Sequence, residues 1–587
     1  MIENFKKIYS LVSFEKKKIF YLFIFILISS TLEILSVAII LPIIMFISKP
    51  EIMSEYFFSK YLINIGYSQN QIILLVVFFF FLIFLIKFLY LSWLAWYKAK
   101  IIYNCEYRIS KKILALNLKK DFSFFNQTNS SNLINLAINQ SSIFAEYGLK
   151  AIFNFFSDLF VVLGILLMLI YFEPFITIIS LVFIGSSFYF IINFTKTRAQ
   201  KWSEEKIISE TNRIRQLNEI LGLIKNIKLG SFENKFFSEF NNFTKRSTYA
   251  TQNQFFLISL PRLFVEFSAI SVFTIILFLM YVLDGLNIEL LPKLALMAAG
   301  AFRILPALGV IQSCIVNIRF VKPVIARIES LLDVKERNFE IYSSLEKEIS
   351  FDSNLIKKNN SNNFLFNKEL LIKNVSFFYD KKKDLVFDKI NMSLKFGEIV
   401  GIIGKSGSGK SSLINLITGI TKPQKGEILI DGININKNLK KWQKNIGYVP
   451  QSIHLMDASI KENIAFGDIA GKENLQRVLE VIRSSNLVSF IKNLDKGINS
   501  LVGEKGSMIS GGQMQRIGIA RGLYYNPRLL ILDESTNALD NETEKEILFE
   551  LKKLKGKVTL MIISHKMQTL KICDQIYKVE DKKIIKI

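Results

Sequence analysis

Residues that form covalent cross-links or metal centres are scarce in this chain. Its 587 residues include three cysteines and two histidines. The cysteines, Cys105, Cys314 and Cys573, are too scattered for a disulfide framework or a metal site. Cys314 falls in an apolar run, and we interpret it as a packing residue. The sequence also lacks an internal repeat.

The composition excludes an ordinary soluble protein. Half of the residues are hydrophobic, phenylalanine alone numbers 52, and the mean hydropathy is +0.32. Six apolar runs are long enough to cross a bilayer core of about 30 Å, which takes about 20 helical residues. Only helices satisfy their own backbone hydrogen bonds in lipid, so these runs must be helical. The six predicted spans are residues 20–47, 72–96, 151–172, 175–194, 263–283 and 291–317.

Lysine and arginine are distributed unevenly between these runs. Residues 98–120 carry seven of them and residues 196–246 carry eleven, whereas the turns at 173–174 and 284–290 carry none. The positive-inside rule then places both termini and both basic segments in the cytoplasm. We therefore expect a multi-pass protein of the bacterial cytoplasmic (inner) membrane. The first run has no cleavage site and is too long for a signal peptide, so it stays in the membrane.

The stretches between the second and third runs (about 50 residues) and between the fourth and fifth runs (about 65 residues) are also unusually long. They are helix-periodic, as in residues 204–228, which indicates spans that continue beyond the membrane as helices. The alternative, solvated charged loops, is less favoured because loops of this length are seldom structureless. The net charge of +24 suits loops that face anionic lipids. The basic residues flank the spans and do not form a continuous surface that could contact nucleic acid, so we expect no nucleic-acid binding.

The last third of the chain contains a phosphate-binding motif. Residues Gly404–Ser411 fit the pattern G-x-x-x-x-G-K-[ST], after the strand-like run Ile399–Ile403. In such a loop, backbone N–H groups converge on phosphate oxygens. Lys410 can reach the terminal phosphates, and the Ser411 hydroxyl can ligate Mg²⁺. The sequence contains no second copy of this motif.

Two further motifs follow in order. Ser510-Gly-Gly-Gln513 comes about 100 residues later, and the apolar run Leu529–Leu532 then ends in Asp533 and Glu534. This ordered set resembles the nucleotide-binding domain of ABC transporters, which implies ATP and Mg²⁺ as ligands. The resemblance assigns nucleotide contacts to Tyr379, Gly404, Ser406, Gly407, Gly409, Lys410, Ser411, Ser412, Gln451, Ser510, Gly511, Gly512, Gln513 and Asp540. It assigns Mg²⁺ to Ser411, Gln451 and Asp533, and catalysis to Glu534, His565 and Lys410.

The chemistry implied is phosphoryl transfer to water, which needs charge neutralisation and an oriented nucleophile. Glu534 would polarise the water, and His565 would hydrogen-bond the γ-phosphate. The alternative for His565 is a strand-end histidine without a role, but its strand–Ser–His context favours function. By resemblance, Ser510 and Gly512 close over the nucleotide of the opposite subunit, so we expect a homodimer.

Departures from the family pattern are mild. Ile509, Asn537 and Lys566 replace the usual leucine, serine and arginine. Gly518 and Gly522 stand where alanines are common, and each should cost an interior helix position about 1 kcal/mol. No catalytic group is lost, so we expect an active ATPase.

The predicted fold class is a multidomain membrane protein. A six-helix, all-α transmembrane domain would span residues 1–333, a polar linker 334–367, and an α/β P-loop ATPase domain 368–587. The arrangement resembles exporters, whose long cytoplasmic helix extensions end in short coupling helices. The candidates for these are residues 122–129 and 224–233.

Charged residues inside spans are functional candidates, because burying them in lipid is costly. Glu33 followed by Pro42, Leu260-Pro-Arg262 with Glu266, and Phe302–Pro306 resemble the flippase of bacterial lipid-linked oligosaccharides. That resemblance implies a glycolipid cargo whose pyrophosphate meets a cavity lined by Lys87, Arg262 and Arg303. The alternatives are snorkelling to the headgroups, or internal pairing such as Arg262 with Glu266.

Two other functions stay open from the sequence. A multidrug or lipid A exporter would share every ATPase residue, and the phenylalanine-rich spans permit it. An ATP-gated channel or regulatory subunit is the other alternative. Intact Glu534 and His565 favour continuous hydrolysis and therefore transport.

Overall fold

The computed structural model describes residues 2–39, 69–172, 174–284, 291–332, 366–379, 385–468, 472–535 and 541–587. The chain divides into two compact units. The first comprises residues 1–120 and 124–351, and the second comprises residues 121–123 and 352–587.

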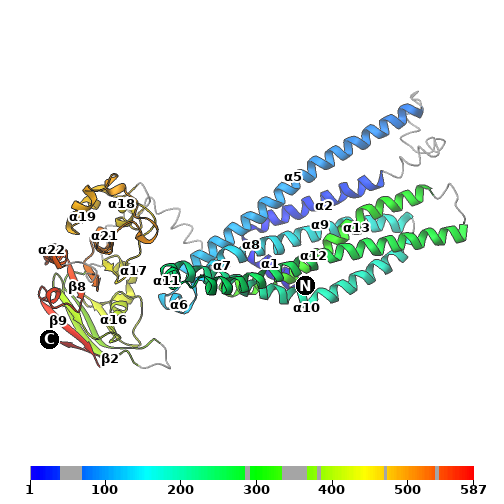
Figure 1. The fold of residues 1–587 in the computed structure, drawn as a ribbon. Coiled ribbons are helices and arrows are strands. Elements are labelled where there is room, and N and C mark those ends of the chain that lie inside the picture. Colours follow the sequence, from blue (N-terminus) through cyan, green and yellow to red (C-terminus); the bar gives the residue numbers. More distant parts are fainter. Residues whose placement is uncertain are drawn as a thin grey trace. The chain divides into compact units, whose positions relative to one another are not determined.

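The first unit is built from long helices that run alongside one another (Figure 1). Its main helices are α1 (Ile2–Leu11), α2 (Lys16–Ala38), α5 (Gln69–Leu118), α9 (Lys150–Phe172), α10 (Pro174–Gly222), α12 (Glu233–Asp284), α13 (Leu291–Phe320) and α14 (Lys322–Leu332). Helix α9 continues a composite helix in which short α-helical pieces, α7 (Ser130–Asn135) and α8 (Ser141–Ile143), alternate with π-helical turns at Leu136–Gln140 and Phe144–Leu149.

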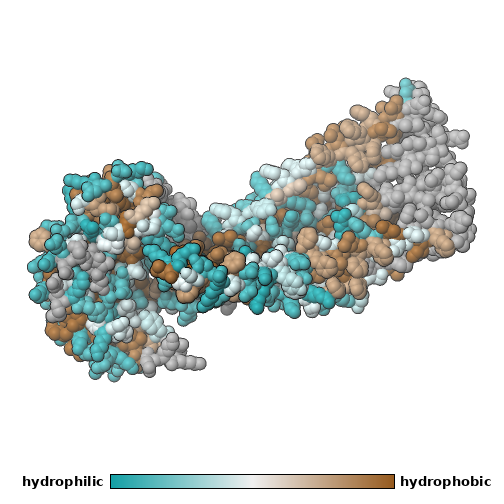
Figure 2. Space-filling model, viewed as in Figure 1, coloured by the Kyte–Doolittle hydropathy of each residue, from teal (hydrophilic) through white to brown (hydrophobic). Residues whose placement is uncertain are grey.

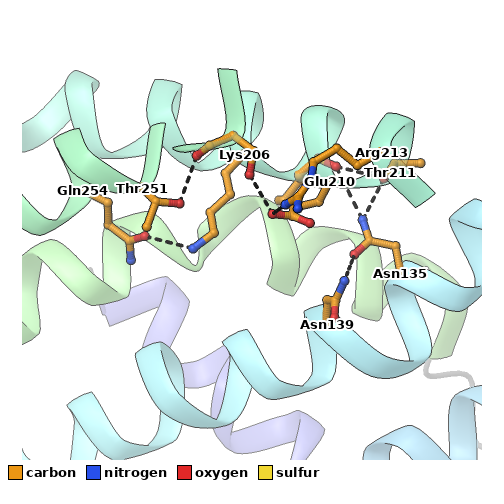
Figure 3. A network of polar contacts seen from close by, with 10 residues as sticks. Asn135, Asn139, Lys206, Glu210, Thr211, Arg213, Thr251 and Gln254 are labelled. Carbon is orange, nitrogen blue, oxygen red and sulfur yellow. Dashed lines mark hydrogen bonds and ion pairs between the residues drawn. The ribbon is translucent and has the colours of Figure 1, made fainter. Parts of the chain in front are cut away.

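Helices α5, α10 and α12 extend well beyond the lengths of the predicted spans. Polar side chains join the extension of α10 to its neighbours (Figure 3): Asn135 Nδ2 donates to Thr211 Oγ1 at 2.7 Å, and Lys206 Nζ donates to Gln254 Oε1 at 3.3 Å. These contacts link α7 to α10 and α10 to α12. The polar residues of the basic segments therefore stabilise helix pairs, which agrees with helices rather than solvated loops.

Short helices lie where the polar interruptions were predicted. They are α6 (Phe122–Gln127) and α11 (Ile224–Gly230). Ser231 adopts a left-handed conformation, with φ of 54°, and the Phe232 N–H bonds the Ile227 carbonyl at 3.0 Å. This bond closes a Schellman motif, which ends α11 sharply. The docking of these helices on an ATPase stays a prediction.

Length and hydropathy select four candidate spans among the described residues. They are Ser13–Ser36, Leu74–Leu118, Ser130–Tyr171 and Gly300–Phe320. The predicted fourth and fifth spans fall inside the continuous helices α10 and α12, and residues 40–47 of the first lie outside the described residues. The six-span count thus stays a prediction. On the face shown in Figure 2, hydrophobic residues gather mostly over the parts of α5 and α12 that lie away from α6 and α11.

The second unit contains two sheets. The larger has the strand order β10 (Lys583–Lys586), β9 (Gln575–Glu580), β3 (Ile399–Ile403), β8 (Thr559–Ile563), β7 (Leu529–Asp533) and β6 (Ile446–Val449). The smaller, antiparallel sheet has the order β2 (Phe387–Lys395), β1 (Glu369–Phe377), β4 (Lys425–Ile430) and β5 (Ile433–Asn434). Phe366 is fully buried in the core of this unit, against Phe396 and Trp442.

Five strands of the larger sheet run parallel, from β9 across to β6. Strands β3, β7 and β8 are almost entirely buried, which explains their continuous apolar sequences. The phosphate-binding loop follows β3, the two carboxylates end β7, and His565 follows β8. Because carboxyl ends of parallel strands share one edge, the topology brings these motifs together.

Candidate nucleotide site

The phosphate-binding loop requires glycine at two positions. Gly407 and Gly409 have φ of 80° and 108°, which favour glycine. A Cβ atom at Gly409 would also approach the ring of Phe387 to 3.0 Å. The loop leads directly into helix α16 (Lys410–Ile417), whose first residue is the motif lysine.

Lys410 is the buried cation of this loop. Its side chain is 8% exposed, and Nζ donates to the carbonyl oxygens of Gly404 at 2.8 Å and Lys405 at 3.1 Å. The Ser408 hydroxyl is buried and has no hydrogen-bond partner within the described residues. A buried ammonium held by neutral carbonyls, beside an unused hydroxyl, fits an anionic ligand such as a triphosphate.

The carboxylate pair lies at the end of β7. Glu534 has φ of 49°, and its N–H donates to the Ile563 carbonyl at 3.1 Å. Left-handed backbone at a glutamate is uncommon and clusters at functional sites. Glu534 Oε2 accepts from Gln451 Nε2 at 2.9 Å, and Oε1 lies 3.1 Å from His565 Nε2. Glu534 therefore contacts two other residues that were singled out from the sequence.

Asp533 is partly buried and lies next to Glu534 at the end of β7. Burial raises the pKa of its carboxyl group, the hydrogen bond from Tyr448 lowers it, the Glu534 charge raises it, and Lys410 lowers it, with the net effect upward. Tyr448 Oη donates to Asp533 Oδ2 at 3.3 Å. Burial and the Asp533 charge raise the pKa of Tyr448 to about 12, so this hydroxyl remains a donor at neutral pH.

Tyr448 was not singled out from the sequence. The available signal was its position in β6, three residues before Gln451, but the pairing of β6 with β7 was needed to place it beside Asp533.

We expect Tyr448→Phe to raise the Mg²⁺ concentration for half-maximal ATP hydrolysis by about tenfold, because hydrogen bonds to metal-binding side chains orient those side chains. A Mg²⁺ titration of ATPase rate measures this. Tyr577→Phe, which removes a hydroxyl bonded to the Ser393 carbonyl, is the matched control. Unchanged Mg²⁺ dependence in Tyr448→Phe would exclude the orienting role.

The turn after β8 fixes His565. The Lys566 N–H donates to Ser564 Oγ at 3.0 Å, and Lys566 Nζ pairs with Glu544 Oε2 at 2.6 Å. Glu544 is 2% exposed and also accepts from Thr569 at 2.8 Å. The lysine that replaces the usual arginine is thus an anchor for this turn.

Tyr379 lies beside the first turn of α16. Its hydroxyl is 3.0 Å from Ser412 Oγ, and half of its surface is exposed. Its ring packs edge-on against Phe377, with centroids 4.9 Å apart. An exposed aromatic face at this place is available for stacking on a base.

The second motif caps helix α21 (Gly511–Tyr524). Ser510 Oγ accepts from the Gln513 N–H at 3.3 Å, and Gln513 Oε1 accepts from the Ser510 N–H at 2.9 Å. This capping box leaves an exposed helix N-terminus, which favours anions. Among the contacts of the described residues, none joins Ser510–Gln513 to the phosphate-binding loop. Asp540 lies outside the described residues.

The glycines of α21 have a packing role. A Cβ at Gly518 would approach Ile453 Cδ1 to 2.3 Å, and one at Gly522 would approach Val449 Cγ2 to 3.0 Å. Both positions therefore permit the helix to lie close to the chain around β6. The two glycines lower the helix propensity of α21, but a larger residue at either position would clash with these neighbours.

Arg521, also not singled out from the sequence, joins α21 to the segment after Gln451. It donates to the Asn463 carbonyl at 2.8 Å, to Asn463 Oδ1 at 2.9 Å and to the His454 carbonyl at 2.9 Å. Its guanidinium also lies over the Phe466 ring, 4.9 Å from the centroid. This side chain therefore ties α21 to the segment that follows Gln451.

We expect Arg521→Ala to lower the free energy of unfolding by about 2 kcal/mol or more, because it removes the donor to the backbone carbonyl oxygens of Asn463 and His454. Chemical denaturation monitored by fluorescence measures this. The exposed Arg483 provides the control, and Arg483→Ala should stay within about 0.5 kcal/mol. Equal stability of the two variants would contradict the linking role of Arg521.

Comparisons with known proteins agree with this architecture. Residues 387–537 match the family described as ABC transporter. The ATP-dependent lipid A-core flippase of Haemophilus influenzae is 38% identical over 212 residues, 36% of each protein. The alpha-hemolysin translocation ATP-binding protein HlyB of Escherichia coli is 38% identical over 220 residues, 37% of this chain and 31% of that protein. The chain spans about a third of the length of the curated relatives it matches.

A solved structure of a bacterial Atm1-family ABC exporter with ATP bound superimposes with a TM-score of 0.75. It is 18% identical and covers 97% of this chain and 94% of its own. The predicted fold class is therefore confirmed: the chain has an ABC exporter fold, with a helical transmembrane domain followed by an α/β nucleotide-binding domain.

Proposed function

We propose that two copies of this chain form an ATP-driven exporter that moves an undecaprenyl-pyrophosphate-linked oligosaccharide across the cytoplasmic membrane. The observation that carries the ATP-driven part is the contact of Gln451 and His565 with Glu534 at the shared end of parallel strands. This arrangement suits hydrolysis, because it places a proton acceptor, a hydrogen-bond donor and a metal-binding amide together.

Each residue has a distinct part in this proposal. Lys410 and the loop N–H groups bind the phosphates, while Ser411, Gln451 and Asp533 would hold Mg²⁺. Mg²⁺ bound there would neutralise charge on the transferred phosphoryl group. Glu534 orients water and accepts its proton, and His565 donates a hydrogen bond to the γ-phosphate.

The second copy completes the site. The exposed N-terminus of α21 carries Ser510 and Gly512, and its free N–H groups are suited to a phosphate. Within the described chain these groups do not reach the phosphate-binding loop. A partner copy related by twofold symmetry would present them to the nucleotide bound by the first copy. Closure of this dimer would be the step that drives the helices.

The cargo part of the proposal rests on cations in the helical unit. Lys87 Nζ donates to Ser36 Oγ at 2.8 Å, and Arg303 pairs with Glu33, so both cations contact α2. Arg262 is largely exposed and bonds Glu266 at 2.7 Å. It lines an open cavity of about 720 Å³ between α12 and α13. A diphosphate headgroup would compete with these carboxylates for the same cations.

A second candidate is a lipid A type exporter. The matched lipid A-core flippase and the toxin translocation protein favour an exporter in general, although the similarity covers only about a third of the chain. Both candidates place a large amphipathic molecule against the helical unit.

Reconstitution into liposomes tests the proposal. Purified protein, ATP and Mg²⁺ are combined with a labelled undecaprenyl-pyrophosphate glycan or with lipid A, and headgroup accessibility is measured. ATP-dependent movement and ATPase stimulation by the glycan lipid alone would support the first candidate, and by lipid A the second. Ion currents in planar bilayers without lipid movement would indicate an ATP-gated channel instead.

A further inference from the structure

An apolar pocket lies near the N-terminus of the helical unit, away from the α12–α13 cavity. Helices α1, α2 and α9 line it, and its volume is about 270 Å³. Its walls include Ile8 from α1, Ile19 and Phe23 from α2, and Ile152 and Phe153 from α9. The only charged side chain among its described lining residues is Lys6. An apolar cavity of about 150 Å³ is enough to bind benzene, so this pocket can hold part of an acyl chain.

Packed aromatic rings fix the pocket wall. Phe5 packs against Phe156 with ring centroids 5.9 Å apart, and Phe23 packs edge-on against both Phe153 and Phe156, at 6.4 and 5.2 Å. These contacts join all three helices around the pocket. Rings held by mutual contacts keep their places when the pocket is filled, so the site is preformed.

Basic residues lie beside the pocket residues in the sequence, and Lys6 itself lines the pocket. Lys16, Lys17 and Lys18 begin α2 and immediately precede the pocket residue Ile19. The carboxylates nearby already have partners: Glu15 pairs with Lys18 and Arg108. Glu3 and Glu329 both pair with Lys7.

Lys6, Lys16 and Lys17 take part in none of these ion pairs within the described residues, and all three are exposed. They precede the predicted first span, and the predicted topology would place them at the level of the cytoplasmic headgroups. Positive charge at this level attracts anionic lipids.

We propose that this pocket binds one acyl chain of an anionic phospholipid of the cytoplasmic leaflet, with the headgroup on Lys6, Lys16 and Lys17. The apolar wall recognises the chain, and the lysines select the headgroup charge. This lipid would be a resident component of the helical unit, distinct from the cargo. It would hold α1 against α2 and α9.

Photocrosslinking of the full-length protein in phosphatidylcholine vesicles tests this proposal. The probes are phosphatidylglycerol and phosphatidylcholine that carry the same photoreactive acyl chain. We expect phosphatidylglycerol to label the peptides that contain Ile19 and Ile152 at least about tenfold more than phosphatidylcholine does. Labelling should fall to the phosphatidylcholine level in K6Q/K16Q/K17Q, because the charges that select the headgroup are gone.

Two further variants sharpen the test. Ile152→Phe fills the pocket and should abolish labelling of the α9 peptide, while K437Q/K440Q/K444Q changes the net charge equally on the second unit and should leave labelling unchanged. Equal labelling by the two lipids, or full labelling of K6Q/K16Q/K17Q, would overturn the proposal.

Discussion

Replacing Glu534 by glutamine should lower the rate of ATP hydrolysis at least about 100-fold, because a general base contributes typically 10²–10⁴-fold. Glutamine has the same shape and can still contact Gln451 and His565, which lie 2.9 and 3.1 Å from the carboxylate. It cannot accept a proton from water. The variant should therefore bind ATP normally but fail to turn it over.

Phosphate release and the identity of the bound nucleotide, both measured on Glu534→Gln, distinguish lost hydrolysis from lost ATP binding. Phosphate release should nearly stop, whereas nucleotide retained after gel filtration should be ATP, held in a dimer. Glu550→Gln, which removes a partly exposed carboxylate paired with Lys553, provides the control with an unchanged rate. Undiminished hydrolysis in Glu534→Gln would remove this residue from its role. A stable monomer that hydrolyses ATP at full rate would exclude the shared site.

The strands that carry the motifs could be predicted because buried strands have continuous apolar sequences. Strands β3, β7 and β8 are buried on both faces, so each is a continuous apolar run that ends at a chemical motif. The order of the strands in the sheet cannot be predicted from these apolar runs. Tyr448 reaches Asp533 only because β6 lies beside β7, and a single sequence does not state the order of strands.

The helical unit shows a similar division between local and distant contacts. The Arg262–Glu266 pair follows from i,i+4 spacing on one helix, and the structure contains it at 2.7 Å. The pairing of Arg303 with Glu33 joins residues 270 positions apart and has no local signal. The two π-helical turns before α9 also have no local signal in the sequence, because π-turns depend on the packing around them.

The Arg303–Glu33 pair changes what a substitution of Arg303 can mean. Arg303 was predicted to meet the cargo, yet in the structure its side chain is 30% exposed and that of Glu33 is 10% exposed. Removing one partner of this partly buried ion pair leaves an uncompensated charge, which destabilises the contact between α2 and α13. Lost transport in Arg303→Ala could therefore report either a missing cargo contact or a destabilised helix pair.

A double substitution separates these two explanations. We expect Arg303→Met and Glu33→Met each to lower the midpoint of thermal unfolding, and the double variant to recover most of the loss, because replacing a buried pair by apolar residues is often neutral. If Arg303 binds the cargo pyrophosphate, the recovered double variant still loses ATPase stimulation by the glycan lipid. If it regains stimulation together with stability, the pair is structural and the cargo contacts lie with Lys87 and Arg262. Thermal unfolding and lipid-stimulated ATPase, measured on all four proteins, decide between them.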